Sequence, residues 1–373
     1  MHKNRESRYY IKNDLLEVNQ NYIFKNLGKM KIKIIVYLLL IVSCWSCPQH
    51  SEKKHFDFRK NIVNVRNKVQ AIEIEDVLIG RFSICYFMDQ YLIIIDTESP
   101  DKVIHLFNKH NFNYITSTGD KGPGPSELTA PGEIAVNEKD RIFYVSDHGK
   151  QKIYIFSLDS VLANPHYYPK ETMNMDKTKF PSDYLYINDT LSIGRFILPI
   201  GNGDYRPSVA KWNMRTGEIT LLNKNDHPKI ERKRASFSAS IEHCIFVECY
   251  HHHDLMAICD LDGNLKYYLY GSRWNDITQN RFSFFGNAAF CKDKIVACYS
   301  AGDENFIIDK DGRTIGGNYP SKFIVFDIHG NYIQTLETRY KISRFCYDAE
   351  NNRIIMILDD EIQFANLDLN GII

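Results

Sequence analysis

Basic and aromatic residues gather between residues 195 and 281, in stretches that also contain glycine, proline and histidine. An arginine side chain can form paired hydrogen bonds with a carboxylate, sulfate or phosphate group, and an aromatic ring can pack against a sugar. These residue types therefore favour an acidic glycan or an acidic protein as the ligand. The candidate binding residues are Arg195, Tyr205, Arg206, Arg232, Lys233, Arg234, His251, His252, His253, Arg273, Trp274 and Arg281.

A second interpretation of the same residues needs no ligand. Their charges could belong to solvated loops and pair with the neighbouring acids Asp226, Glu231, Asp303 and Glu304. The chain as a whole has 46 basic and 46 acidic residues, so no overall charge favours nucleic acid or a membrane surface. Both interpretations of the local charges stay open, and no nucleic acid partner is expected.

Three consecutive histidines raise the question of a metal site. In an extended segment His251 and His253 would point to one side while His252 points to the other. A zinc site takes at least three protein ligands, and the sequence places no further ligand beside this pair. The segment is therefore expected to be a polar loop, and no metal site is predicted.

A unit of about 50 residues recurs along the chain and would position all of these residues. Its clearest copy has strands at 131–136, 141–146 and 152–156, joined by short polar turns. One such sheet cannot bury both of its faces, so the copies must pack against each other, as in solenoids and propellers. The first two strands of the six copies are expected at 82–87 and 90–95, 131–136 and 141–146, 184–187 and 190–196, 235–241 and 244–250, 287–291 and 294–299, and 343–347 and 353–358.

The third strand of each copy ends in an apolar residue followed by a polar one, where a turn is expected. These polar residues are Asn108, Ser157, Asn213, Asp260, Asp327 and Asp368. The rhythm of short strands, without a long amphipathic helix, predicts an all-β fold: a six-bladed β-propeller of four-stranded antiparallel blades over residues 62–373. A propeller of this kind is expected to be monomeric.

The sixth copy lacks a fourth strand, because the sequence ends at Ile373 directly after the turn of its third strand. Residues 69–74 alternate between apolar and polar types and belong to no other copy. We expect this N-terminal strand to complete the last blade, which closes the ring and covers an open sheet edge. The loops after the second strands and the connections between blades then share one face. The candidate binding residues of blades three to five would lie on that face.

The N-terminal region has the features of a lipoprotein signal. Residues 34–43 are uncharged and mostly apolar, follow Lys31 and Lys33, and are too short to span a bilayer. They end in Ile41-Val42-Ser43-Cys44, which resembles a bacterial lipobox with Cys44 as the lipid attachment site. An ordinary cleaved signal or a buried strand is the alternative. We expect 1–29 to be a misassigned extension before a start at Met30, 30–43 to be the signal peptide and 44–61 to be a flexible tether.

The other eight cysteines lack the regular spacing of a disulfide scaffold. Most lie in apolar strands, where a free cysteine packs as a small hydrophobic residue. Buried thiols are therefore expected, and Cys291 with Cys298 is the first pair to check for a disulfide.

Residues 119–156 resemble an NHL repeat: a Gly- and Pro-rich lead is followed by Gly132-Glu133-Ile134-Ala135-Val136, then Ile142-Phe143-Tyr144-Val145-Ser146-Asp147 and Ile153-Tyr154-Ile155-Phe156. With the lipobox, the six copies resemble the TolB-like six-bladed propeller lipoproteins of Bacteroidetes. The resemblance covers about residues 70–373, although only the second blade matches closely. It implies an outer-membrane lipoprotein, periplasmic or surface-exposed, that binds or scaffolds other molecules.

Two functions follow as expectations. The first is a lipid-anchored, non-enzymatic propeller that binds a protein or an acidic glycan. The second is a hydrolase or lyase, because related propeller enzymes hold calcium in the central channel with Asn, Asp and Glu side chains. Glu133 and Asp183 could contribute to such a site, but a full ligand set is not visible. The sequence contains no GxSxG elbow, HExxH motif or P-loop.

Overall fold

The computed structural model describes residues 52–373, except for residues 165, 170, 223–225, 276–281, 305 and 309. The predictions for the signal segment and for Cys44 therefore lie outside the described residues. Within the described part, no helix has the length and apolarity needed to cross a membrane.

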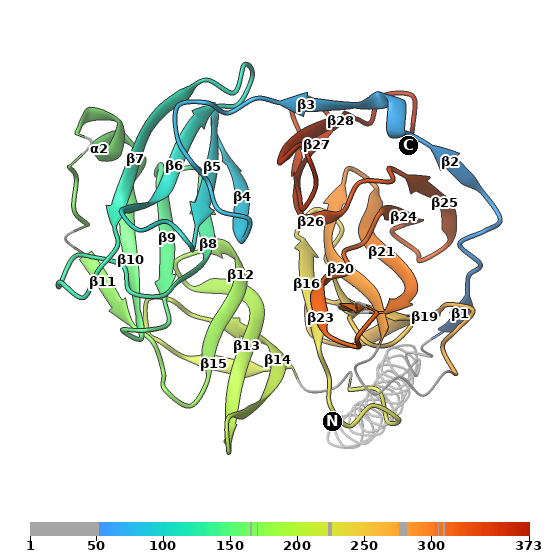
Figure 1. Cartoon of the computed structure of the whole chain (residues 1–373). Coiled ribbons are helices and arrows are strands. Elements are labelled where there is room, and N and C mark those ends of the chain that lie inside the picture. The colour runs from blue at the N-terminus through green and yellow to red at the C-terminus, as the bar shows by residue number, and fades with distance from the viewer. Residues whose placement is uncertain are drawn as a thin grey trace, which may run out of the picture. The chain divides into compact units, whose positions relative to one another are not determined.

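Six sheets, each built on antiparallel strands, are arranged in a ring (Figure 1), which confirms the predicted six-bladed propeller. Each blade begins with a strand near the centre and adds its neighbours outwards in sequence order, except that β1 (Glu52–His55), β2 (Ile62–Asn64) and β3 (Val69–Ile72) form the outer edges of the last three blades. The first three blades are β4 (Ser83–Met88), β5 (Tyr91–Asp96), β6 (Lys102–Asn108) and β7 (Tyr114–Asp120); β8 (Pro131–Asn137), β9 (Ile142–Asp147), β10 (Lys152–Ser157) and β11 (Glu171–Asn174); and β12 (Phe180–Asn188), β13 (Leu191–Gly201), β14 (Asp204–Trp212) and β15 (Ile219–Leu221). Helix α2 (Leu158–Ala163) follows β10.

The last three blades carry additions from the N-terminal part of the chain. Blade five also contains a small inserted hairpin, β22 (Phe306–Ile308) and β23 (Thr314–Gly317), between its second and third strands. The principal strands are β16 (Ala235–Ser240), β17 (Ile245–Tyr250), β18 (Leu255–Asp260) and β19 (Leu265–Tyr270); β20 (Phe282–Cys291), β21 (Lys294–Glu304), β24 (Lys322–Asp327) and β25 (Tyr332–Glu337); and β26 (Ile342–Asp348), β27 (Arg353–Leu358) and β28 (Phe364–Asp368).

Strand β3 (Val69–Ile72) supplies the fourth strand of blade six, as predicted for the N-terminal strand. It runs antiparallel to β28, with Ile72 opposite Phe364 and Val69 opposite Leu367. A short 3-10 turn, Arg66–Lys68, precedes it. Strand β3, from the N-terminal side of the propeller, and β28, from its C-terminal end, thus pair in one sheet and close the ring (Figure 1).

Residues 52–64 differ from the expectation of a flexible tether that runs to residue 61. Strand β1 (Glu52–His55) pairs in parallel with β19, and β2 (Ile62–Asn64) pairs in parallel with β25. Phe56 is buried, with its ring centroid 5.2 Å from that of Phe326. Strand β1 could not be predicted from the sequence. It is an outer edge strand, and its mainly exposed, charged residues do not alternate between apolar and polar types.

Tight turns join the first two strands of the blades. In five of them a residue other than glycine adopts a left-handed conformation, with φ between 49° and 53°: Asp89, Arg141, Cys244, Lys292 and Asn352. Only Asp89 and Asn352 are of the types that tolerate this conformation well, and other turns could be located from neighbouring residues such as Asp140 and Asp293.

The polar residue at the end of each third strand has a structural role. Asn108, Asn213, Asp260, Asp327 and Asp368 each accept hydrogen bonds from backbone amides two or more residues later, as in the 2.9 Å bond from the His329 amide to Asp327. Ser157 instead caps helix α2 by accepting from the Ser160 amide. The repeated polar residue therefore fixes a turn and needs no ligand to explain it.

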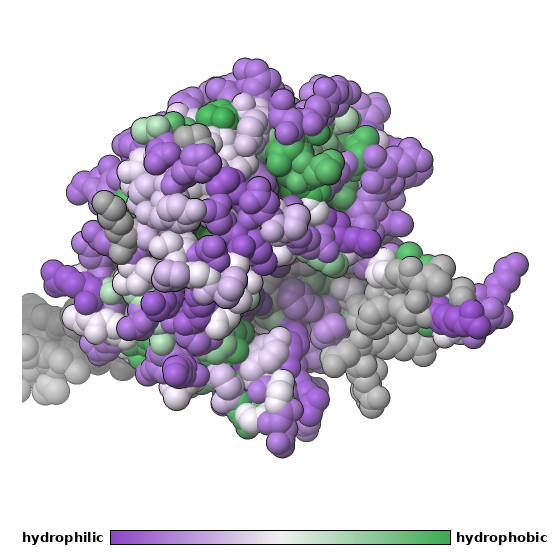
Figure 2. Space-filling model, turned by 60° about the vertical axis from the view of Figure 1, so that its left-hand side comes forward, coloured by the Kyte–Doolittle hydropathy of each residue, from purple (hydrophilic) through white to green (hydrophobic). Residues whose placement is uncertain are grey.

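The core is divided among the seams between blades. The described residues form six apolar clusters, each built from two neighbouring blades. Blade six and blade one, for example, share a cluster that includes Ile72, Ile94, Ile355 and Phe364. The face drawn in Figure 2 is mainly hydrophilic, with apolar side chains exposed in a few patches. Most of the apolar strand residues are thus used to hold neighbouring blades together.

The seven cysteines in the described part are free thiols, and five of them are buried as expected. The suggested pair Cys291 and Cys298 is wrong. Cys291 lies opposite Lys294 beside the turn, whereas the Cys298 Sγ lies 3.6 Å from Asn287 Oδ1, further along the same hairpin. At about 3.4 Å per residue, this separation along the strands is too large for a disulfide.

Candidate functional site

The hairpin formed by β13 and β14 carries the first group of predicted binding residues. It is longer than the other strand pairs of its blade, and its tip projects at the lower edge of Figure 1. The tip turns at Gly201, Asn202 and Gly203, all of which have positive φ. Two of the three are glycines, for which this conformation is unstrained.

A groove of about 290 Å3 lies between this hairpin and the connection that enters blade four. It brings together five of the predicted residues, which are Tyr205, Arg206, Arg232, Lys233 and Arg234. We call this the hairpin groove. Its lining contains four basic side chains and three acidic ones, Asp204, Asp226 and Glu231, so the alternative of paired loop charges holds in part.

Tyr205 and Arg234 contact each other closely in the hairpin groove. The Arg234 guanidinium carbon lies 4.1 Å from the centre of the Tyr205 ring, within the range of a cation–π contact. Arg234 also donates to Asp204 Oδ1 at 2.9 Å and to the Tyr205 carbonyl at 3.2 Å. The Tyr205 backbone amide and the Arg234 guanidinium lower the pKa of Asp204. The ring and the guanidinium are thus held as one unit.

Arg232 is the most solvent-exposed of these cations. Its side chain is 75% exposed, and its guanidinium lies 3.8 Å from Asp204 Oδ2, a loose ion pair. Exposed pairs of this kind contribute about 0–1 kcal/mol, so the guanidinium can exchange Asp204 for another anion at little cost.

Lys233 has a structural role. Its ammonium lies 2.7 Å from Glu248 Oε1 and 3.1 Å from Asp226 Oδ1, and both the Lys233 and Glu248 side chains are almost fully buried. Burial alone would lower the pKa of Lys233, but the charges of Glu248 and Asp226 raise it above its ordinary value. Arg206 pairs with the same Asp226. Lys233 and Arg206 therefore neutralise acids of the protein itself.

The three histidines lie at the seam between blades four and five. His251 Nδ1 is 2.8 Å from the Phe285 carbonyl, and His252 Nδ1 is 3.1 Å from the Phe282 carbonyl. Burial lowers the pKa of His251 to about 4, so this ring is neutral at physiological pH. His253 packs edge-on to Tyr250. The histidines thus join two blades. Among the described residues, no group of three or more His, Cys, Asp or Glu side chains is placed to hold a metal ion.

Arg273 and Trp274, which were also predicted to bind the ligand, do not line the hairpin groove and contact other groups of the protein. Arg273 donates to the Gly302 carbonyl at 2.6 Å and lies over the Phe282 ring. Trp274 is half-buried, edge-on to His227 and Tyr270 at centroid distances of 4.7 and 4.8 Å. Arg281 lies outside the described residues.

Arg195 faces the centre of the ring and not the loop face. It pairs with Asp183 at 2.9 Å and donates to the Ala235 carbonyl at 2.6 Å. The sequence could not separate the two locations, because Arg195 lies in the same strand as the groove hairpin.

A second polar group lies at the centre of the ring. Tyr86 of blade one donates to Glu133 of blade two at 2.7 Å, and Arg344 of blade six lies 3.7 Å from the same carboxylate. Blades two and six are not neighbours, so this contact crosses the central channel. A cavity of about 260 Å3 there is lined in part by Tyr86, Glu133 and Asp183.

The channel does not favour the calcium ion considered for a propeller enzyme. Glu133 and Asp183 are present as expected, but Arg344 and Arg195 stand beside them and supply positive charge. Calcium takes six to eight oxygen ligands, and two carboxylates already paired with guanidinium groups do not provide them. We therefore derive no chemical step through a channel metal.

Asp183 gives a testable pH dependence. Burial raises its pKa to about 6, against the opposing charge of Arg195. Because the folded-state pKa exceeds the unfolded one, protonation favours the folded state, and stability from this group grows as the pH falls from about 6 towards 4. Between about pH 8 and pH 5, wild type should gain roughly 1 kcal/mol of unfolding free energy relative to Asp183→Asn. Urea unfolding across this pH range measures the difference, and parallel curves for the two proteins would contradict it.

Comparisons with known proteins agree on the fold. A family model described as a six-bladed β-propeller, within a domain family of unknown function, matches residues 73–193. No curated protein matches this chain. A protein from Bacteroides vulgatus, from another family of unknown function, is similar in structure with a TM-score of 0.51 at 11% identity, covering 81% of this chain and 98% of its own.

Two further solved structures are similar to the same extent. A protein from Bacteroides fragilis, provisionally described as exported, has a TM-score of 0.52 at 10% identity and covers 83% of this chain and 89% of its own. A luciferin-regenerating enzyme has a TM-score of 0.50 at 10% identity and covers 80% of this chain and 93% of its own. At these identities the similarity shows the fold alone, and the function must be argued from the site.

Proposed function

We propose that this chain is a lipid-anchored, TolB-like propeller of the bacterial cell envelope that binds an acidic glycan in the hairpin groove. The protein acts in this proposal as a monomeric, non-enzymatic binding module, held to the outer membrane by a lipid on Cys44. Support for the envelope location comes from the lipobox-like segment before Cys44 and from a similar structure provisionally described as exported.

One observation carries the proposal of an acidic ligand. The Tyr205 ring and the Arg234 guanidinium are stacked at 4.1 Å beside the exposed Arg232. A uronic acid presents an apolar ring face and a carboxylate at its edge. The ring face can lie on the exposed part of Tyr205, and the carboxylate can replace Asp204 as the partner of Arg232.

Several of the predicted binding residues already have partners within the protein, so fewer residues are left to bind the ligand. Arg206 and Lys233 already pair with Asp226, and Arg273 is held by the Gly302 carbonyl. The binding contribution is therefore assigned to Tyr205 and the loosely paired Arg232, with Arg234 holding the Tyr205 ring in place. A segment of an acidic protein could use the same cations but gains less from the flat ring, and it is the alternative outcome of the test.

The ligand class can be tested on an array of acidic and neutral saccharides. We expect the purified propeller to bind oligosaccharides that contain uronic acid or sulfate, to ignore neutral ones, and to lose binding at high salt because the contacts lie at the surface. Replacing both Arg232 and Tyr205 by alanine should weaken binding at least about tenfold, a loss of roughly 1.4 kcal/mol. Arg215→Ala, an exposed arginine in the turn between β14 and β15, is the matched control and should bind as wild type does.

Two outcomes would count against the glycan. Binding of acidic peptides but of no saccharide would shift the assignment to a protein partner. Saccharide binding that is unchanged in the double variant would show that the hairpin groove is not the binding site.

A further inference from the structure

Two cysteines meet at the seam where the ring closes, on the first strands of blades one and six. Cys85 lies in β4 and Cys346 in β26, at opposite ends of the propeller sequence. The Cys85 Sγ lies 3.9 Å from the carbonyl oxygen of Ile355, and Ile355 is the residue directly opposite Cys346 in the β26–β27 pair. The Cys85 side chain therefore points across the seam to the position that Cys346 occupies.

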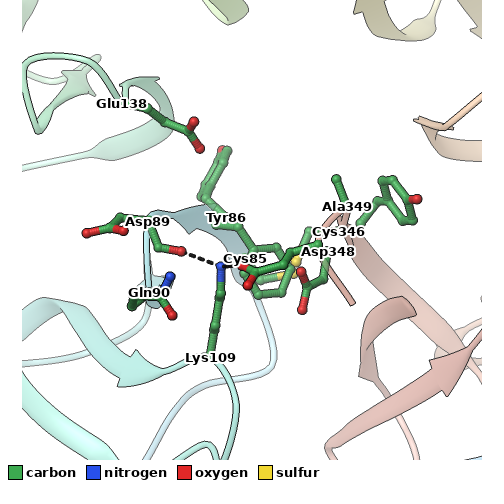
Figure 3. A pocket seen from close by; sticks show the side chains of 12 residues that line it. Cys85, Tyr86, Asp89, Gln90, Lys109, Glu138, Cys346, Asp348 and Ala349 are labelled. Carbon is green, nitrogen blue, oxygen red and sulfur yellow. Dashed lines mark hydrogen bonds and ion pairs between the residues drawn. The ribbon is translucent and has the colours of Figure 1, made fainter. Parts of the chain in front are cut away.

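The two side chains also lie next to each other. Both pack in the apolar cluster shared by blades one and six, and the nearby Cys85 thiol adds to burial in raising the pKa of Cys346. Figure 3 draws Cys85 and Cys346 close together at this seam.

The pair borders a cavity at this end of the seam. A cavity of about 530 Å3 is lined by both cysteines and by the first turns of blades one and six (Figure 3). Lys109 bridges these turns, because its ammonium donates to the Asp89 carbonyl at 2.6 Å and pairs with Glu350. The first turns of blades one and six are thus held together beside the cysteine pair, and the cavity borders both cysteines.

We propose that Cys85 and Cys346 form a disulfide that joins the first and last blades. The oxidant is a disulfide, either a small one such as oxidised glutathione or that of a thiol–disulfide oxidoreductase. One cysteine thiolate attacks it and releases one thiol, and the second thiolate then attacks the mixed disulfide and releases the other. The protein loses two protons and two electrons, and the oxidant is reduced to two thiols. Oxidising compartments outside the cytoplasm maintain such bonds.

The bond would add a covalent closure to the hydrogen-bonded closure made by β3 and β28. Both act at blade six, but β3 closes the outer part of the sheet and the disulfide would close its inner strand against blade one. Since the bond links residues at opposite ends of the propeller sequence, it restricts most of the unfolded chain.

Peptide mapping of the purified protein tests the proposal independently of export and of ligand binding. After incubation with oxidised glutathione at mildly alkaline pH, alkylation and mass spectrometry should find a Cys85–Cys346 cross-linked peptide that disappears on reduction. The oxidised protein should melt roughly 5 °C or more above the reduced one. Cys346→Ser should abolish both effects, and Cys291→Ser should leave both unchanged. Should Cys346→Ser fail to fold, the peptide map of the wild type still decides.

The proposal is overturned if Cys85 and Cys346 remain fully alkylatable after this treatment. It is equally overturned if each carries its own glutathione adduct, or if the cross-link joins other cysteines. Loss of glycan binding would leave this result untouched, so the two proposals fail separately.

Discussion

Proline at both Gln70 and Ala71 is expected to lower the free energy of unfolding by about 3 kcal/mol or more and to promote association of the chain. These residues lie in β3, opposite Asn366 and Ala365 of β28. Backbone amides of successive strand residues point to opposite sides, so one of the two substitutions must remove an amide that faces β28. Losing this pairing opens the edge of the last blade. Urea unfolding and size-exclusion chromatography measure the two effects.

A matched pair of substitutions separates the backbone effect from any side-chain effect. Gln70 and Ala71 are both exposed, so Gln70→Ala with Ala71→Ser should change the unfolding free energy by no more than about 0.5 kcal/mol. A double-proline protein that is monomeric and as stable as wild type would contradict the role of β3 in closing the ring.

Lys233→Met is expected to cost about 3–5 kcal/mol of unfolding free energy, because it leaves the Glu248 carboxylate buried without its partner. Glu248 is 2% exposed and its carboxylate has Lys233 at 2.7 Å. The second carboxylate oxygen of Glu248 has no hydrogen-bond partner in the protein, so no other protein group compensates for the loss. Denaturant unfolding at neutral pH measures the effect.

Two companion variants show whether the lone charge is the cause. Lys229→Met removes an exposed lysine from the same connection and should change stability by no more than about 0.5 kcal/mol. Adding Glu248→Gln to Lys233→Met removes the stranded charge and should restore a large part of the loss. An unchanged unfolding midpoint in Lys233→Met would show that the pair is not structural.

The fold could be predicted because its determinants are local. Turn residues such as Asp89 and Asn352 mark where two strands meet, and the polar residue after each third strand, such as Asp260 or Asp327, fixes the next turn. The strand at 69–72 belongs to no other repeat copy, so it could pair only with the open edge of the last blade. Each inference needed only a few neighbouring residues and the repeat period.

The outer strands β1 and β2 and the grouping of the site residues could not be predicted in this way. The side chains of β1 are mostly exposed, so it lacks the alternation that marks a strand with one buried face. Lys233 and Arg232 are neighbours in the sequence, yet one is buried against Glu248 and the other is exposed. Their difference depends on which way each side chain points at the entry to blade four. Cys85 and Cys346 meet only because the ring closes.

The hairpin groove is most directly tested by isothermal titration with an acidic saccharide taken from the array, using wild type, Arg232→Ala with Arg234→Ala, and Arg215→Ala. The account predicts that the double variant binds at least about tenfold more weakly while remaining folded, and that Arg215→Ala binds as wild type does. Equal affinity in all three proteins would contradict binding in the hairpin groove.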